Sequence, residues 1–78
     1  MIVRCVTAGA NPQGEPDFHF CKVECDDEQY SEGEHYFAAR EQAERDGYCN
    51  ELVVFDQYDI GEWFFENFVW VSATTVRI

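Results

Sequence analysis

Two runs of β-forming residues flank a short segment rich in glycine and proline near the start of the chain. The first run covers residues 2–8 and the second covers residues 18–25, and residues 9–16 between them are typical of a loop. The second run alternates between two faces, with Phe18, Phe20, Lys22 and Glu24 on one and His19, Cys21, Val23 and Cys25 on the other. This period of two predicts an antiparallel hairpin with a long loop.

The middle of the chain has the residue spacing of one amphipathic helix. Ser31 and Glu34 fit a capping box at the helix start, and Gly47 is a typical residue just beyond a helix end. Alanine side chains on the inner side would let this helix lie close against a sheet. The expected inner stripe contains Tyr36, Ala39 and Ala43, and the solvated side carries the opposite-charge pairs Arg40–Glu44 and Glu41–Arg45.

The C-terminal part of the chain predicts further strands. Residues 52–55 are apolar on both faces, which predicts a central strand that is covered on both sides. Residues 58–65 fit a short helical turn better than a strand extension. Residues 68–78 resume the alternation of a strand and are expected to close the fold.

These elements predict an α+β fold in a single domain, residues 1–78. A chain of 78 residues is too short for two independent cores. We expect an antiparallel or mixed sheet of about four strands, with one main helix packed on one face, in the order β-β-α-β-β. The other face of the sheet would be partly open.

The acidic residues are concentrated in the middle of the chain. The 16 acidic and five basic residues give a net charge of −11, and residues 24–46 hold nine of the acids but only Arg40 and Arg45 as cations. Part of this charge suits the first turn of the predicted helix, where negative groups interact favourably with the helix dipole. The remainder has too few cationic neighbours to be neutralised within the segment.

This charge excludes some partners and favours others. Direct binding to nucleic acid needs lysine and arginine to displace counterions from phosphates, so we expect no direct nucleic-acid partner. Anionic membrane surfaces are disfavoured for the same reason. A basic protein surface, in contrast, would attract this chain in a salt-sensitive manner.

Four cysteines raise the question of disulfides, metal binding and cellular compartment. No apolar run has the length of a signal peptide core or of a membrane span, so we expect a cytoplasmic protein without a disulfide framework. Cys21 and Cys25, with His19 or His35, could be drawn as zinc ligands, but a regular strand would hold both cysteines too far apart for a zinc knuckle. We therefore expect no metal and no cofactor. The cysteines are expected to be buried small hydrophobes or exposed thiols, and an exposed Cys49 could join two copies.

The sequence also lacks the motifs of common enzymes. It contains no nucleophile elbow, no P-loop and no His-Glu-x-x-His motif, and pairs of cysteine and histidine arise easily by chance in a chain with four and two of them. A thin core leaves little room for a deep substrate pocket. We therefore expect that the protein is not an enzyme.

Aromatic residues supply a second candidate for partner binding. Trp63 and Phe64 lie within a short run bounded by Glu62 and Glu66. Aromatic side chains most often belong to the core, but one helix cannot easily cover all those in this chain, and tryptophan is enriched at interface hot spots. This run is therefore expected to contact a partner or a second copy of the chain.

The small size, the net charge of −11 and the acidic middle resemble the small acidic inhibitors of phages and mobile elements, which include anti-CRISPR proteins and DNA mimics. The resemblance is one of composition and charge layout. It implies a carboxylate surface that occupies the basic surface where a partner, such as a CRISPR surveillance complex, would hold nucleic acid. It also implies a host-cell cytoplasm as the place of action and leaves a symmetric homodimer open. The residues expected to bind the partner are Asp26, Asp27, Glu28, Glu32, Glu34, Glu41, Glu44, Trp63 and Phe64.

A different function remains open on the same residues. In this alternative the protein is an accessory or structural interaction protein that self-associates or docks through the aromatic run around Trp63, and its acidity serves only solubility. Binding would then depend little on salt, whereas an acidic inhibitor would lose its partner when its carboxylates are replaced.

Overall fold

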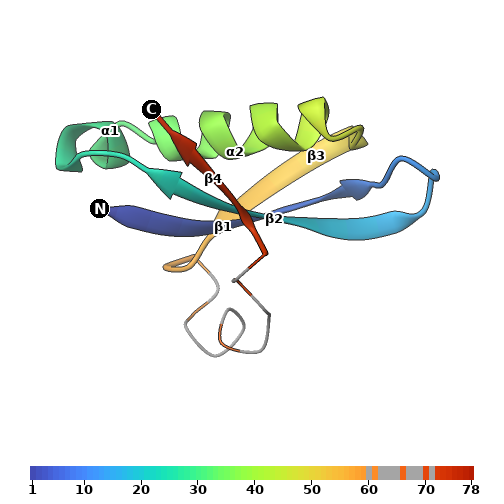
Figure 1. Cartoon of the computed structure of the whole chain (residues 1–78), viewed down its shortest axis with the longest axis horizontal. Helices are drawn as coiled ribbons and strands as arrows, with labels where there is room; N and C mark the ends of the chain where they lie inside the picture. The colour runs from blue at the N-terminus through green and yellow to red at the C-terminus, as the bar shows by residue number, and fades with distance from the viewer. Residues whose placement is uncertain (60, 62–65, 67–69, 71) are drawn as a thin grey trace.

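The predicted hairpin forms the centre of the sheet in the computed structural model of the chain, which describes residues 1–59, 61, 66, 70 and 72–78 (Figure 1). Strands β1 (Ile2–Ala10) and β2 (Pro16–Glu24) pair antiparallel along their whole length, as predicted. The loop between them is shorter than the expected residues 9–16. The Asn11 side-chain oxygen closes it by accepting hydrogen bonds from the backbone nitrogens of Gln13 and Glu15, both at 3.0 Å.

Two further strands extend the hairpin into a four-stranded mixed sheet. Strand β3 (Cys49–Asp56) pairs antiparallel with β1, and β4 (Thr74–Arg77) pairs parallel with β2, so the order is β3-β1-β2-β4. Helix α2 (Glu34–Arg45) lies across one face of this sheet (Figure 1). The α+β prediction of a four-stranded sheet with one main helix is therefore confirmed.

The predicted position of residues 52–55 at the centre of the sheet is wrong, because β3 is an edge strand. Val54 packs against the core beneath α2, whereas Phe55 points to the opposite face across from Val6. Apolar residues on both faces of a strand indicate that other parts of the protein cover those faces. They do not indicate whether the strand has a neighbouring strand on each of its two edges. Val53 shows the incomplete cover, since it is 49% exposed.

The predicted element order and helix start also need correction. A separate short helix, α1 (Asp27–Ser31), precedes α2, so the elements within the described residues follow the order β-β-α-α-β-β rather than β-β-α-β-β. The capping box lies at Asp26 and Gln29 instead of Ser31 and Glu34, and Gly33, with a φ of +75°, separates the two helices. Glycine adopts the left-handed backbone conformation easily, and this conformation at Gly33 ends α1. Ser31 is therefore the last residue of α1 and not the N-cap of a longer helix.

The C-terminal end of α2 agrees with the prediction. Gly47 follows the C-cap Asp46 with a φ of +89°, and its backbone nitrogen donates a hydrogen bond to the Glu44 carbonyl at 3.0 Å. The predicted last strand over residues 68–78 is confirmed for residues 74–77 and wrong for residues 70, 72, 73 and 78, which are described and not in a strand, while residues 68, 69 and 71 lie outside the described part. The predicted turn over residues 58–65 also lies mostly outside it.

The core lies between α2 and the adjoining face of the hairpin. Val3 and Val23 are fully buried there, and Ala39 and Ala43 are the small residues through which α2 touches the sheet. Tyr36, expected on the inner stripe, is only partly buried, and His35 takes the inner position instead. A histidine therefore occupies the interior of the fold.

The cysteines divide into two groups. Cys5, Cys21 and Cys25 are buried in the core, as predicted for small hydrophobes, whereas Cys49 is exposed. Burial, with a smaller contribution from the charge of Asp46, raises the pKa of the Cys21 thiol to about 11. A thiol with so high a pKa is a poor nucleophile at neutral pH. Within the described residues, no three His, Cys, Asp or Glu side chains are grouped to hold a metal ion.

Candidate functional site

The two helices carry most of the acidic residues that the sequence analysis singles out. Five carboxylates lie along α1, at its two ends and at the start of α2, and no lysine or arginine occurs in residues 23–39. Cations that are near in sequence therefore cannot neutralise them. These five residues, called the acidic surface below, are Asp26, Asp27, Glu28, Glu32 and Glu34.

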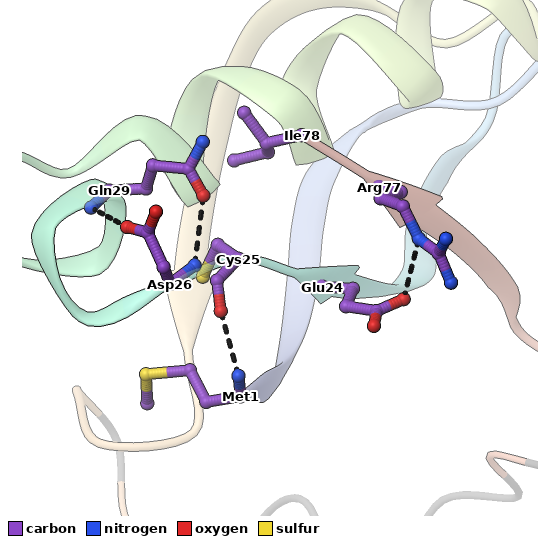
Figure 2. A pocket seen from close by; sticks show the side chains of 7 residues that line it. All are labelled: Met1, Glu24, Cys25, Asp26, Gln29, Arg77 and Ile78. Carbon is purple, nitrogen blue, oxygen red and sulfur yellow. Dashed lines mark hydrogen bonds and ion pairs between the residues drawn. The ribbon is translucent and has the colours of Figure 1, made fainter.

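The hydrogen bonds of Asp26 fix the start of this surface. The Asp26 side chain accepts a hydrogen bond from the Gln29 backbone nitrogen, and the Gln29 side chain accepts one from the Asp26 backbone nitrogen, each at 2.8 Å (Figure 2). This reciprocal pair begins α1. Asp27 and Glu28 follow in the exposed first turn, where the free backbone N–H groups favour negative charge. The fold therefore fixes the backbone that carries these carboxylates at little cost.

The turn between the helices continues the acidic surface onto α2. Glu32 is the exposed C-cap residue of α1, and Glu34 is the first residue of α2. None of Glu32, Glu34, Asp27 and Glu28 forms an ion pair with any residue in the described ranges. Their charges are available to an external cation.

The other two acidic residues of the predicted site differ from these. Glu44 pairs with Arg40 at 3.2 Å, and Glu41 pairs more loosely with Arg45 at 3.8 Å. These are the two pairs expected from the i,i+4 spacing, and both lie on the solvated side of α2. The structure therefore divides the predicted set into a compensated part on the middle and end of α2 and an uncompensated part around α1.

The predicted aromatic residues Trp63 and Phe64 lie outside the described residues. Among the aromatic side chains that the structure describes, Tyr30 stacks on His35 with ring centroids 4.7 Å apart, and Tyr58 meets Tyr30 edge-on at 5.8 Å. Such contacts pack part of the aromatic set within the fold. The acidic surface is consequently the part of the predicted site whose geometry the structure describes.

A hollow of about 400 Å³ borders the acidic surface beside Asp26 (Figure 2). Glu24 and Arg77, which are register partners on β2 and β4, form an ion pair at 3.0 Å in its lining, and Asp26 and Gln29 hold each other as described above. Its charged side chains are therefore already partnered, and we assign it no ligand of its own. Its lining consists of Met1, Glu24, Cys25, Asp26, Gln29, Arg77 and Ile78.

Phe37 is a surface residue that the sequence analysis missed. It is 69% exposed on α2, one turn after Glu34 and one turn before Glu41. A second hollow, of about 260 Å³, is lined by Glu34, Phe37, Ala38, Glu41 and Ile78. The sequence did contain a signal, because Phe37 falls on the side of the helix opposite Ala39 and Ala43 when the residues are spaced by 100°.

A buried polar network around Asp56 was also missed. The Asp56 carboxylate accepts hydrogen bonds from His35 Nε2 at 2.8 Å and from the Tyr36 hydroxyl at 3.0 Å, and both His35 and Asp56 are 2% exposed. It also accepts bonds from the backbone nitrogens of Tyr58 and Asp59. These contacts join α2 to the end of β3. The bonds from His35 and Tyr36 span 21 and 20 residues of sequence, so no local pattern predicts them.

The electrostatics of Asp56 fit a structural role. Burial by itself raises the pKa of this carboxyl, but the hydrogen bonds from His35, Tyr36 and the two backbone nitrogens outweigh burial and lower the pKa below its ordinary value. The pKa of the Tyr36 hydroxyl is raised by burial and by the adjacent carboxylates. The Asp56 carboxylate is occupied by these donors, whereas the buried His35 Nδ1 has no hydrogen-bond partner among the described residues, and we assign the network to stabilising the fold.

Asp46 provides a test of how such carboxylates respond to pH. It lies 2.6 Å from His19 Nε2, and this hydrogen bond is the main cause that lowers the pKa of Asp46 from 3.8. A lowered carboxyl pKa stabilises the fold above the pKa of the unfolded chain, and the stabilisation is lost as pH falls through the folded pKa. We expect the stability difference between the wild type and Asp46→Asn to shrink as pH falls from about 4 to 2.

Urea denaturation of both proteins across that pH range measures this difference directly. Exposed acids titrate in the same range, but they are identical in the two proteins and cancel in the comparison. A difference that stays constant or grows at low pH would show that the charge of Asp46 does not act through His19.

The structure thus defines a small α+β protein with a mixed four-stranded sheet and an uncompensated acidic surface at one end of its helical layer. No protein-family model matches the chain, and no curated protein or solved structure was found to match it. In the described part of the chain, no helix combines the length and apolar character needed to cross a bilayer.

Proposed function

We propose that this protein is a binding inhibitor whose acidic surface docks on the basic, nucleic-acid-binding surface of a partner protein or ribonucleoprotein. The observation that carries the proposal is the absence of ion pairs at Asp27, Glu28, Glu32 and Glu34 within the described residues. Four carboxylates without ion pairs within eight residues of the chain repel one another, and a cationic partner relieves that repulsion.

The arrangement of the helices supports this function over simple solubility. Acids that serve solubility alone are usually interspersed with cations, as Glu41 and Glu44 are with Arg45 and Arg40. The acidic surface, in contrast, sits on a capped helix and a tight turn, so the backbone that carries its carboxylates is ordered before the partner arrives. Prior ordering reduces the entropy that binding must offset. A carboxylate surface of this kind can take the place of nucleic-acid phosphates on lysine and arginine side chains.

Two triple variants test the proposal with matched changes of charge. Asp27→Asn/Glu28→Gln/Glu32→Gln removes three charges from the acidic surface. The control Glu15→Gln/Glu51→Gln/Glu66→Gln removes three exposed charges elsewhere and leaves the same net charge. Each protein is used to capture partners from a nuclease-treated lysate of its source cells. The captured protein is then purified and loaded with a fluorescently labelled nucleic acid.

We expect the wild type to displace the nucleic acid from the captured protein in a fluorescence-anisotropy assay, with weaker displacement as salt rises. The variant of the acidic surface should lose at least about tenfold in affinity, and the control less than about twofold. Equal losses in the two variants would show that only net charge matters. Binding that resists both salt and the first variant would contradict the proposal and favour the aromatic alternative, which Trp63→Ala/Phe64→Ala then measures.

A further inference from the structure

The most exposed large hydrophobic side chain in the described residues lies beside the acidic surface. Phe37 is 69% exposed, whereas the same helix buries His35, Ala39 and Ala43 against the sheet. A phenylalanine held in water without a covering group loses the stabilisation that burial normally provides. Its position on a regular helix, with a rotamer set by the preceding turn, makes it a defined contact point.

The surroundings of Phe37 combine an apolar floor with negative charge at both ends. Phe37, Ala38 and Ile78 supply apolar surface to the hollow of about 260 Å³, and Glu34 and Glu41 lie one helical turn to either side. Glu34 has no ion-pair partner among the described residues, and Glu41 is held only by the loose 3.8 Å contact with Arg45, in which both side chains are about two-thirds exposed. Both carboxylates can therefore turn towards an incoming cation.

We propose that this hollow receives an arginine side chain of the basic partner, an inference that rests on the proposed function and names its contact. The methylene stem of arginine would cover Phe37 and Ile78, and the planar guanidinium would stack on the Phe37 ring. Its fan of N–H donors would then reach Glu34 and Glu41. Lysine offers a point charge without the planar surface, so it fits the hollow less well.

The charges argue against other occupants of the same hollow. A second copy of this chain would place Glu34 and Glu41 against identical carboxylates in a symmetric contact. A purely apolar helix would bury those carboxylates without partners, which is costly. An anionic lipid surface would be repelled. Only a cationic group with an apolar stem satisfies both parts of the hollow.

Two peptides of equal charge test the inference. The probes are short glycine peptides that carry three arginines or three lysines, titrated into the isotopically labelled protein and followed by amide chemical shifts. We expect the arginine peptide to shift Phe37, Ala38 and Glu41, and to bind at least about threefold more tightly than the lysine peptide. Phe37→Ala should remove this preference, whereas Val53→Ala, at a half-exposed residue on the sheet, should leave it unchanged.

The outcomes separate this inference from the proposed function. Equal binding of the two peptides, or a preference for arginine that survives Phe37→Ala, would overturn the proposal that this hollow binds arginine. It would do so even if the variant of the acidic surface still loses the partner. Conversely, a preference for arginine that is lost in Phe37→Ala would support arginine binding in the hollow even if the variant of the acidic surface keeps its partner. Because Phe37 is exposed, its replacement by alanine is expected to preserve the amide spectrum of the folded protein, which serves as the folding control.

Discussion

Replacement of Asp56 by alanine is expected to lower the free energy of unfolding by about 3 to 5 kcal/mol. The carboxylate accepts hydrogen bonds from His35 and Tyr36 of α2 and from two backbone nitrogens of the following turn, and the bond to His35 is buried while the others are partly buried. Its removal leaves His35 buried and the other donors partly buried without their acceptor, which costs more than the hydrogen bonds themselves contribute. A domain of this size is stable by only about 4 to 12 kcal/mol, so much of the margin would be lost.

A graded series makes this expectation measurable by urea denaturation at neutral pH. Tyr36→Phe removes one donor and should cost about 1 kcal/mol. Asp56→Asn keeps the shape and one acceptor oxygen, so it provides a folded intermediate case if Asp56→Ala does not fold. Glu51→Ala, at an exposed residue of the same strand, is the control. A loss at Asp56→Asn and Asp56→Ala no larger than at Glu51→Ala would show that the network does not hold α2 to β3.

Ala39→Leu is expected to lower the free energy of unfolding by about 2 to 3 kcal/mol. Ala39 is fully buried where α2 meets the hairpin, among Val3, Cys5, Cys21 and Val23. Protein interiors are packed too densely to accept three additional carbon atoms, so the helix must move away from the sheet or the neighbours must leave their preferred rotamers.

The matched control for this variant is Ala38→Leu, one residue earlier on α2 but only partly buried. Both changes add the same side chain, and leucine and alanine are both good helix formers, so the comparison isolates the packing. We expect the control to change the free energy of unfolding by less than about 0.5 kcal/mol. Similar losses in the two variants would show that the close approach of α2 to the sheet does not limit the volume at Ala39.

The sequence predicted the elements whose signals are local. The hairpin follows from alternation on both sides of a glycine and proline segment, and the end of α2 follows from Gly47. The pairs Arg40–Glu44 and Glu41–Arg45 follow from their spacing on a helix. Each of these features depends on residues within a few positions of one another, where backbone geometry alone decides the outcome.

Where two local signals competed, the sequence analysis chose the wrong one. Both Asp26 with Gln29 and Ser31 with Glu34 have residues suited to a cap, and the conformation of Gly33 decided that the chain would begin two helices rather than one. The capping residues alone do not reveal that choice, and in the structure α1 contacts α2, while α2 packs on the sheet. The consequence matters for function, since this turn carries the acidic surface from one helix to the next.

The sequence by itself determined the charge of this protein, its hairpin and the helix that crosses it. Only the tertiary structure decided that β3 is an edge strand, that Asp56 meets His35, and which carboxylates are left without a cation. The reason is physical: composition and periodicity fix which residues avoid or seek water, whereas pairing across strands and between helix and sheet depends on contacts distant in sequence. The same contacts turn Phe37 outward beside Glu34 and Glu41, and so place an apolar residue within the acidic part of the surface.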